Sequence, residues 1–464
     1  MILSILKFAF VFFLVIEFTV CFRSDIVTNF HYPVQNWTDI IIPPGQCWAT
    51  LPFAAVLFVL IAVGMLIFTL ARSGFLLLRF WDVRHFCTYV LGLPTSDVHL
   101  ADLTWSSVQQ RLIDVQHDIF LCRGKAQLDQ LDIYNRILRF NNYLIAMVNK
   151  DILPVRFPFP FTSPYYDVEP GVSGPVGGYI YLSDGYLFNL KFLLFWSPWA
   201  PFTRNRHLRP DFKRISNRIE LASKLAWNAQ ILGVLNLLFS PVVFIIQLLI
   251  FFCANAQKLR YEPVSFLGRR WSNYSRLYLR HFNELRHEFT FRLGSAYRPA
   301  ARYLDCFPSR LLSVVAGNLA FIAGGASVIL FCLGLIRDQL LHLPGYLAIV
   351  TGGGLLASAC ISLVPDENTV YCPKNALLAT LMRIHYMPDH WKEMCHTNQV
   401  RSEFSQLFQY RLVGYLEELL SPLITPFLLM FAVPGSALNI VDFLRNYTAE
   451  VKLMTLLLLY CLLR

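Results

Sequence analysis

The chain has 464 residues, of which 55% are hydrophobic and 15% are charged, and its formal net charge is +10. This composition excludes an ordinary soluble protein and indicates an integral membrane protein. The positive charge is expected to face anionic lipid headgroups, and nucleic acid is the weaker interpretation. Eleven scattered cysteines form no C-x-x-C pair, so the sequence predicts neither a zinc site nor a disulfide framework, and no cofactor is expected.

The first two apolar runs predict two membrane-spanning helices. The run 1–21 is the first, although its pattern also fits a signal peptide. After it, 22–46 is expected to be a luminal loop, and its N-W-T motif offers Asn36 for glycosylation. The second helix is expected at 47–71. Three arginines follow it, which places the chain from residue 72 in the cytosol by the positive-inside rule.

The stretch 72–224 predicts a cytosolic helical region. Its clearest helical pattern is "LDQLDIYNRILRFNNYLIAMVNK". The segment 157–185 is rich in proline and glycine, which predicts an inserted loop with one hairpin.

The next apolar run, 225–257, is uncharged and long enough to cross a bilayer, but Pro241 interrupts it. If it crossed, 258–310 would be luminal, and that segment holds eleven Lys and Arg residues against four acidic residues. The positive-inside rule opposes this placement. We therefore expect a re-entrant helix pair that turns near Pro241 and returns to the cytosolic side.

Two further spans are expected at 311–336 and 339–364, and only two residues separate them. Such a short connection predicts an antiparallel hairpin. Small-residue stretches, "AGGAS" and "TGGG", predict close contact between helices in the membrane. The segment that follows, 365–418, is expected to be a second cytosolic helical region.

Three prolines break the last long apolar run, 419–440. By analogy with the first broken run it is expected to be re-entrant, and 441–464 is expected to be a C-terminal tail. The predicted fold is therefore an all-α integral membrane protein with four transmembrane helices, two re-entrant half-membrane helices and a cytosolic helical region.

The basic segment 258–310 carries aromatic and apolar residues at steps of three and four, which predicts one helical face. These residues are Trp271, Tyr274, Tyr278, Phe282, Leu285 and Phe289. One interpretation is a helix that lies on the membrane with basic residues toward headgroups. The residues assigned to that basic surface are Arg269, Arg270, Arg276 and Arg280. The other interpretation, left open here, is the core of a cytosolic domain.

Two histidine-containing motifs resemble metal sites but favour a structural role. "HFNELRHEF" places His281, Glu284, His287 and Glu288 close together, yet it lacks the H-E-x-x-H spacing and predicts a solvated polar face. "IHYMPDHW" groups two histidines with an aspartate, His385, Asp389 and His390, and predicts a turn with an aromatic anchor. No nucleotide-binding or common hydrolase motif is present in the sequence, which argues against an ATP-driven pump and against an enzyme.

Charged residues at the ends of the two broken runs are candidates for a polar lipid path. Lys258, Arg260 and Glu262 follow the first run, and either anchor it at the headgroups or line a path for them. Glu417 and Glu418 precede the second run, and either cap a helix or line such a path.

Five stretches together resemble the autophagy-related protein 9 family: "DIYNRILRFNNYLIAMVNKDILPVRF", "YLRHFNELRHEF", "YRPAARYLDCFPS", "IHYMPDHW" and "EFSQLFQYRLVGYLEELLSPLITPF". They occur in order between about Trp81 and Glu450. The chain departs from the family pattern in its short N-terminal region, in the insertion 157–185 and after Glu450, as expected of a shortened paralogue or an incomplete gene model.

The resemblance implies an intertwined homotrimer that scrambles phospholipids without ATP on Golgi- and endosome-derived vesicles. It further implies action at the preautophagosomal membrane, with the endoplasmic reticulum as a further location. The implied partners are phospholipids, a bridge-like lipid-transfer protein and other autophagy initiation factors, and no nucleic acid. Two rival functions are a membrane scaffold that marks vesicles and docks autophagy factors, and an ion channel.

Overall fold

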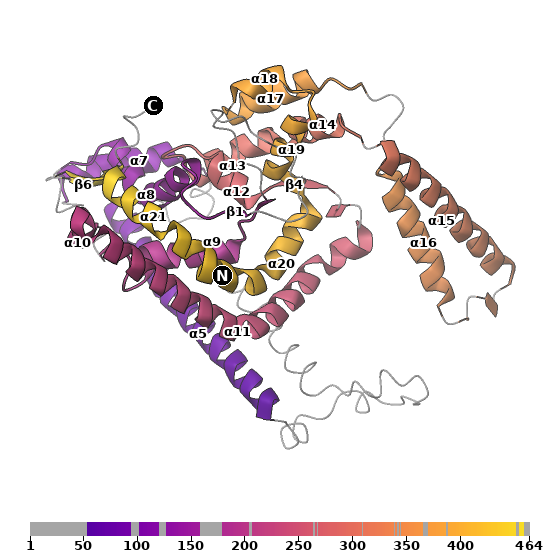
Figure 1. Cartoon of the computed structure of the whole chain (residues 1–464), viewed down its shortest axis with the longest axis horizontal. Helices are drawn as coiled ribbons and strands as arrows, with labels where there is room; N and C mark the ends of the chain where they lie inside the picture. The colour runs from indigo at the N-terminus through magenta and orange to yellow at the C-terminus, as the bar shows by residue number, and fades with distance from the viewer. Residues whose placement is uncertain are drawn as a thin grey trace. The chain divides into compact units, whose positions relative to one another are not determined.

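Long helices dominate the computed structural model (Figure 1). It describes residues 53–458 except 94–101, 120–126, 158–178, 204–206, 263–264, 267, 309, 338, 341–342, 344, 365–369, 387 and 452–453. The expected first helix, 1–21, the luminal loop, 22–46, and Asn36 lie outside the described residues.

Contacts divide the chain into two units. Unit 1 comprises the described parts of Met1–Met147, Gly185–Ala254 and Leu419–Arg464, and unit 2 comprises those of Val148–Asp184 and Asn255–Glu418. Some helices run from one unit into the other.

The elements that lie mainly in unit 1 are α5 (Phe53–His85), η1 (Phe86–Val90), α7 (Trp105–Asp114), η2 (Val115–His117), α8 (Gln130–Asn149), α9 (Asp184–Lys191), η3 (Phe192–Trp196), α10 (Pro210–Lys213), η4 (Ile215–Asn217), α11 (Arg218–Tyr261), α20 (Arg411–Phe427), η7 (Leu428–Ala432), α21 (Val433–Tyr447), β5 (Thr448–Val451) and β6 (Met454–Leu458).

The elements of unit 2 are β1 (Arg156–Phe157), β2 (Tyr179–Ile180), β3 (Arg269–Trp271), α12 (Asn273–Tyr278), α13 (Arg286–Ser295), α14 (Tyr297–Asp305), α15 (Arg310–Ile336), α16 (Tyr346–Ile361), α17 (Pro373–Ile384), α18 (Asp389–Glu393), α19 (Asn398–Leu407) and β4 (Phe408–Tyr410).

The strands among the described residues form three two-stranded antiparallel ladders. Strand β1 pairs with β2, with Arg156 opposite Ile180, so the hairpin predicted for the inserted loop is present at its base. Strand β3 pairs with β4, with Arg270 opposite Gln409. The third ladder joins β5 and β6, so part of the expected tail is a hairpin that follows α21.

The second predicted span is longer than expected. Helix α5 continues beyond residue 71, through all three arginines that follow the apolar run. No proline lies in this stretch, and Gly74 is an isolated glycine, which a long helix tolerates at modest cost. The apolar run and its basic flank are therefore one helix.

The expected turn at Pro241 is wrong, because α11 is one helix of 44 residues that contains this proline. Figure 1 shows it as a bent helix and not as two helices joined by a turn. A proline inside a helix removes one backbone hydrogen bond and bends the axis, while the bonds before and after it persist.

The second broken run is also helical throughout. Pro422 and Pro426 lie inside α20, and Pro434 is the second residue of α21. Because the preceding segment continues into α21 without a break, Pro434 also removes one backbone donor from the helix. The π-helical segment η7 joins the two helices. Among the described residues, three helical stretches are long and apolar enough to cross a membrane: Ile215–Ala256, Arg310–Ile336 and Arg411–Tyr447.

The two apolar helices predicted at 311–336 and 339–364 are present as a packed pair, α15 and α16, which lie side by side in Figure 1. Helix α16 has 16 residues and is shorter than the described helices that are long enough to cross a membrane. Helix α16 begins later than expected, after Gly345, whose φ of 85° is left-handed. The two small-residue stretches face each other. A Cβ placed on Gly324 would lie 3.3 Å from Ala357, and one placed on Gly353 would overlap the Ser327 hydroxyl oxygen.

Substitution of Gly353 should therefore open this hairpin. We expect Gly353→Val to lower the free energy of unfolding by about 1–3 kcal/mol, because added atoms in a packed contact force helices apart. Gly354→Val is the matched control, since no atom lies within 4 Å of a Cβ at Gly354. Thermal unfolding in detergent measures both, and equal midpoints for the two variants would contradict this packing.

Candidate functional site

The aromatic stripe of the basic segment forms part of the core of unit 2. The segment is not one amphipathic helix: β3, α12, α13 and α14 follow each other, and Asn283 turns the chain between α12 and α13 with a φ of 57°. Trp271, Tyr274, Leu285 and Phe289 are buried. The surface-helix interpretation is wrong and the core interpretation holds, because pairing of β3 with β4 brings Trp271 against Phe408.

Three of the four arginines assigned to a basic membrane surface are engaged within unit 2. Arg269 lies 4.0 Å from the centre of the Tyr410 ring and donates to its hydroxyl at 2.8 Å. Arg270 lies over the Tyr415 ring, and Arg280 donates to the Glu284 carbonyl at 2.9 Å. Burial lowers the pKa of the Arg269 and Arg280 guanidinium groups.

Among these four arginines, only Arg276 is exposed, and the other three are half-buried. Arg270 also passes so close to Gly414 that a Cβ there would overlap its guanidinium. The segment's positive charge therefore helps to hold β3 against β4 and α20, and its membrane-facing part is smaller than the sequence predicted.

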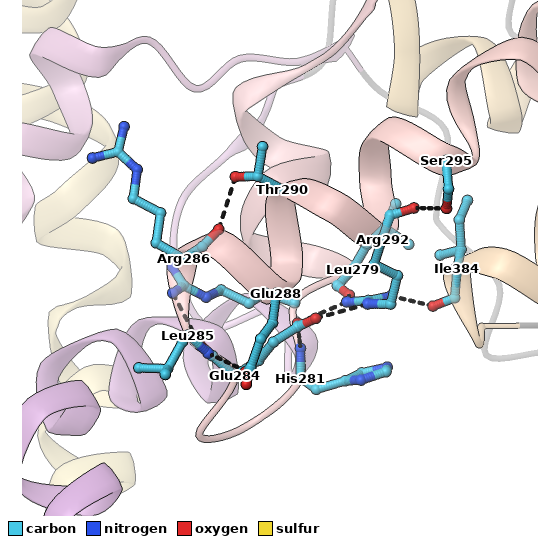
Figure 2. Close-up of polar contacts among 11 residues, drawn as sticks. Leu279, His281, Glu284, Leu285, Arg286, Glu288, Thr290, Arg292, Ser295 and Ile384 are labelled. Atoms are coloured by element: carbon cyan, nitrogen blue, oxygen red, sulfur yellow. Dashed lines mark hydrogen bonds and ion pairs between the residues drawn. The ribbon is translucent and has the colours of Figure 1, made fainter. Parts of the chain in front are cut away.

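Figure 2 shows a buried ion pair that the sequence interpretation missed. The Arg292 Nε and Nη2 atoms donate to the two carboxylate oxygens of Glu284 at 2.8 and 2.7 Å. Arg292 also donates to the backbone carbonyls of Leu279, at 2.8 Å, and of Ile384. The Glu284 side chain is only 10% exposed, so the predicted solvated face is wrong for this residue, whereas His287 and Glu288 are exposed.

The ion pair sets the protonation of Glu284. Burial is the largest contribution and raises the pKa of the carboxyl group, but hydrogen bonds from Arg292 and the His281 backbone N–H, together with the Arg292 charge, outweigh it and leave the pKa lowered. The pair joins α13 to the loop before it and to the end of α17, so its role is to position these elements.

The second histidine motif is a structural turn with an aromatic anchor, as predicted. His385 ends α17 with a left-handed φ of 56°. His390 Nε2 lies 3.0 Å from a Glu403 carboxylate oxygen, and the buried Trp391 donates to the same oxygen at 2.7 Å. Across the described residues, no group of three or more His, Cys, Asp or Glu side chains could hold a metal ion.

Two of the lipid-path candidates lie one helical turn apart at the end of α11. Lys258 and Glu262 are exposed, and the Glu262 N–H donates to the Lys258 carbonyl at 2.8 Å. Arg260 lies in the same turn of α11, and its side chain is outside what the structure describes. The chain therefore presents at least one exposed charge of each sign at this helix end.

Glu417 and Glu418 do not cap a helix, because they are the seventh and eighth residues of α20. Glu417 accepts hydrogen bonds from the Tyr179 hydroxyl and from Gln409 Nε2, the latter at 2.9 Å. Glu418 accepts from the Asp184 backbone N–H at 3.1 Å and from Asn273 Nδ2 at 2.5 Å. Both carboxylates thus tie α20 to neighbouring segments of unit 2.

A row of polar groups inside apolar helices of unit 1 was missed by the sequence interpretation. Asn236 of α11 donates to Asn189 Oδ1 of α9 at 2.9 Å, and Asn189 donates to the Gly185 carbonyl at the same distance. A Cβ on Gly185 would lie 2.6 Å from the Ser421 hydroxyl of α20, which is 3.2 Å from that of Thr425.

We call these five residues, Asn236, Asn189, Gly185, Ser421 and Thr425, the polar seam. It links three helices through small and polar residues. Its sequence signal is weak, namely single polar residues within the apolar stretches "GVLNLLFS" and "SPLITPF". Only the packing shows that they meet.

Loss of the Glu284–Arg292 pair should destabilise unit 2. We expect Glu284→Gln to lower the free energy of unfolding by about 3–5 kcal/mol, since it leaves Arg292 buried without its counter-charge. Because the folded pKa of Glu284 is lowered, the stabilisation is fully present above the usual value of about 4.5 and is lost as pH falls through the lowered value.

Chemical denaturation at pH 7 and below pH 4.5 measures this effect. Glu220→Gln is the control, because Glu220 pairs with Lys224 on an exposed surface and should leave stability unchanged. A difference between wild type and Glu284→Gln that does not shrink on acidification would contradict the assignment.

Sidedness predicts that Asn36 alone carries glycan among the three N-x-S/T motifs. Asn273 is half-buried and its amide donates to Glu418, so a glycan there would break this contact. Glycosidase treatment should shift the mobility of wild type and of Asn273→Gln, but not of Asn36→Gln. Asn446→Gln is the control on exposed Asn446, and a shift that depends on Asn273 would place unit 2 in the lumen.

The amino-acid sequence is similar to that of known autophagy proteins. The family model for Autophagy protein ATG9 matches residues 1–455. Autophagy-related protein 9A of Bos taurus is 36% identical over 451 residues, which cover 96% of this chain and 52% of the relative. Autophagy-related protein 9 of Dictyostelium discoideum is 30% identical over 432 residues, 89% of this chain and 57% of the relative.

The fold is also similar to that of a solved structure. The cryo-EM structure of Schizosaccharomyces pombe Atg9 aligns with a TM-score of 0.68 and 25% identity, over 100% of this chain and 93% of that one. The chain spans about half the length of the full-length relatives it matches. On the family match and the shared fold, this chain belongs to the ATG9 family of autophagy membrane proteins.

Proposed function

We propose that this autophagy membrane protein is an ATP-independent phospholipid scramblase, which re-equilibrates lipids between leaflets while an autophagosome membrane forms and grows. A headgroup crosses a bilayer slowly because about 30 Å of hydrocarbon solvates its charges poorly. A protein accelerates this step when it offers polar groups along the way. The activity transports lipid and catalyses no chemical reaction.

The polar seam is the observation that carries this proposal. Polar residues in membrane helices are expensive, and they commonly mark a substrate pathway. Here they lie on α9, α11 and α20, and the last two are among the helices apolar and long enough to cross a membrane. Helices with internal proline or π-helical segments are typical where protein or water surrounds the backbone, and α11, α20 and η7 have these features.

The charged end of α11 supplies a second part of the proposed path. Lys258, Arg260 and Glu262 present both signs of charge, which suits a zwitterionic headgroup that has shed part of its hydration. Glu417 and Glu418 do not belong to this lining, because protein donors already occupy their carboxylates. We assign them to positioning α20.

Family membership supports a proposal for the wider setting. We propose a homotrimer on Golgi- and endosome-derived vesicles and at the preautophagosomal membrane. Lipid would arrive through a bridge-like lipid-transfer protein, and other autophagy initiation factors would bind the cytosolic regions. In this arrangement both ends of α11 lie on the cytosolic side, as the charge distribution favours. The bend of this one helix at Pro241, and not a turn between two helices, would return it from the cytosolic leaflet, and the continuous helical stretch from α20 to α21 would do the same.

Neutral replacement of the charged helix end should slow lipid exchange. We expect Lys258→Leu, Arg260→Leu and Glu262→Leu together to reduce the rate in protein-containing liposomes about tenfold, which corresponds to a barrier rise of about 1.4 kcal/mol. The control replaces the exposed residues Lys374, Lys392 and Glu393 by leucine, which removes the same charges elsewhere. Fluorescent-lipid accessibility measures both.

A second variant tests the seam in the same assay. Asn236→Leu removes its polar contact with Asn189, and should also slow exchange if the seam lines the path. Native mass measurement must show equal assembly for all variants. Wild-type rates in both the triple variant and Asn236→Leu would favour the rival function, a scaffold that does not transport lipid.

A further inference from the structure

A cavity in unit 2 lies at the start of α15, away from the polar seam and from the charged end of α11 in sequence. Its volume is about 650 Å³, within the range of small-molecule sites in proteins. Three segments build it: the turn between α14 and α15, the residue before the α17 cap, and the first turns of α19. The residues used below are Phe307, Arg310, Ser313, Tyr371, Asn398 and Arg401.

The charge of the cavity is positive. Arg310 and Arg401 line it, together with the neutral polar side chains of Ser313, Tyr371 and Asn398, and no described Asp or Glu side chain lies on its wall. Neither guanidinium has a carboxylate partner among the residues that the structure describes. Arg401 instead lies 5.8 Å from the centre of the Phe307 ring. An anion would give both guanidinium groups a partner that none of the described residues supplies.

The cavity lies beside a helix surface that lipid would cover. Arg310 is the first residue of α15, one of the helices apolar and long enough to cross a membrane. Val314, which lines the cavity, and Leu311 beside it are 64% and 78% exposed. The opening therefore joins an arginine-lined pocket to the apolar helix surface that lipid tails cover, which is headgroup depth.

We propose that this cavity binds the phosphate headgroup of an anionic phospholipid of the cytosolic leaflet. Two arginines favour a phosphomonoester, such as that of phosphatidic acid, over phosphatidylcholine, because a choline cation would find no carboxylate on the described wall. Arginine suits the phosphate through paired N–H donors, and the first-turn N–H groups of α15 add a weaker attraction. The site does not depend on scrambling, since a chain that moves no lipid would still bind there.

Native mass spectrometry of the full chain in detergent tests this site. Dioleoyl phosphatidic acid, dioleoyl phosphatidylcholine and inorganic phosphate are titrated separately. We expect wild type to hold phosphatidic acid at lower concentration than phosphatidylcholine. Arg310→Gln with Arg401→Gln should raise the half-saturating concentration of phosphatidic acid at least about tenfold, as expected for loss of charge-assisted hydrogen bonds.

The matched control is Arg286→Gln with Arg298→Gln, which removes two exposed arginines outside the cavity and should change this concentration less than twofold. Arg310→Gln alone, at an exposed position, keeps the test valid if the double variant does not fold. Unchanged binding by the folded double variant would overturn the site, and so would unchanged binding by folded Arg310→Gln if the double variant does not fold. Equal affinity for phosphatidylcholine would overturn its selectivity, and displacement by low millimolar inorganic phosphate would assign it to a soluble anion.

Discussion

Hydrocarbon cannot accept or donate hydrogen bonds, and this constraint determines the structure of the long apolar helices. Every backbone N–H and carbonyl in a membrane helix needs a partner inside the protein. The chain meets most of this demand by remaining helical through its prolines, from Arg218 to Tyr261 and from Arg411 to Tyr447, although each interior proline removes one backbone bond. Polar side chains of these helices also have partners inside the protein: Asn236 donates to Asn189, and the Ser421 and Thr425 hydroxyl groups lie 3.2 Å apart.

The same constraint explains why small residues matter where helices meet. The hydrophobic effect does not drive helices together in lipid, so close packing and hydrogen bonds must stabilise their association. Gly353 lies against Ser327 between α15 and α16, and a Cβ on Gly233 of α11 would lie 2.6 Å from Met430 of η7. Tight contacts and a polar seam thus share one cause, and under the proposed function the seam that joins these helices would also offer polar partners to headgroups.

Sequence patterns predicted the parts of the fold that depend on local composition. The uncharged run before Arg72, the hairpin around Arg337 and the helix over Gln130–Asn149 all follow from apolar length or periodicity. The turn at Pro241 was wrong because a proline bends a helix without ending it when the flanking bonds persist. The prediction of a surface helix was wrong because β3 pairs with β4, a strand over 130 residues away, and this pairing turns Trp271 inward. Periodicity within one segment contains no information about such a distant strand.

The same distinction applies to the site residues: some have a setting that depends on neighbours along the chain, and others have one that depends on distant segments. A charge at a helix end, such as Lys258 or Glu262, is visible in sequence because its neighbours along the chain define its setting. Glu284 and Arg292 are eight residues apart, yet their setting depends on Ile384. The arginines of the cavity come from α15 and α19, and nothing in either stretch indicates the other. A pair of arginines is informative only once the described wall around it is known to hold no acid, so the proposed anion selectivity depends on the folded chain and not on any motif in it.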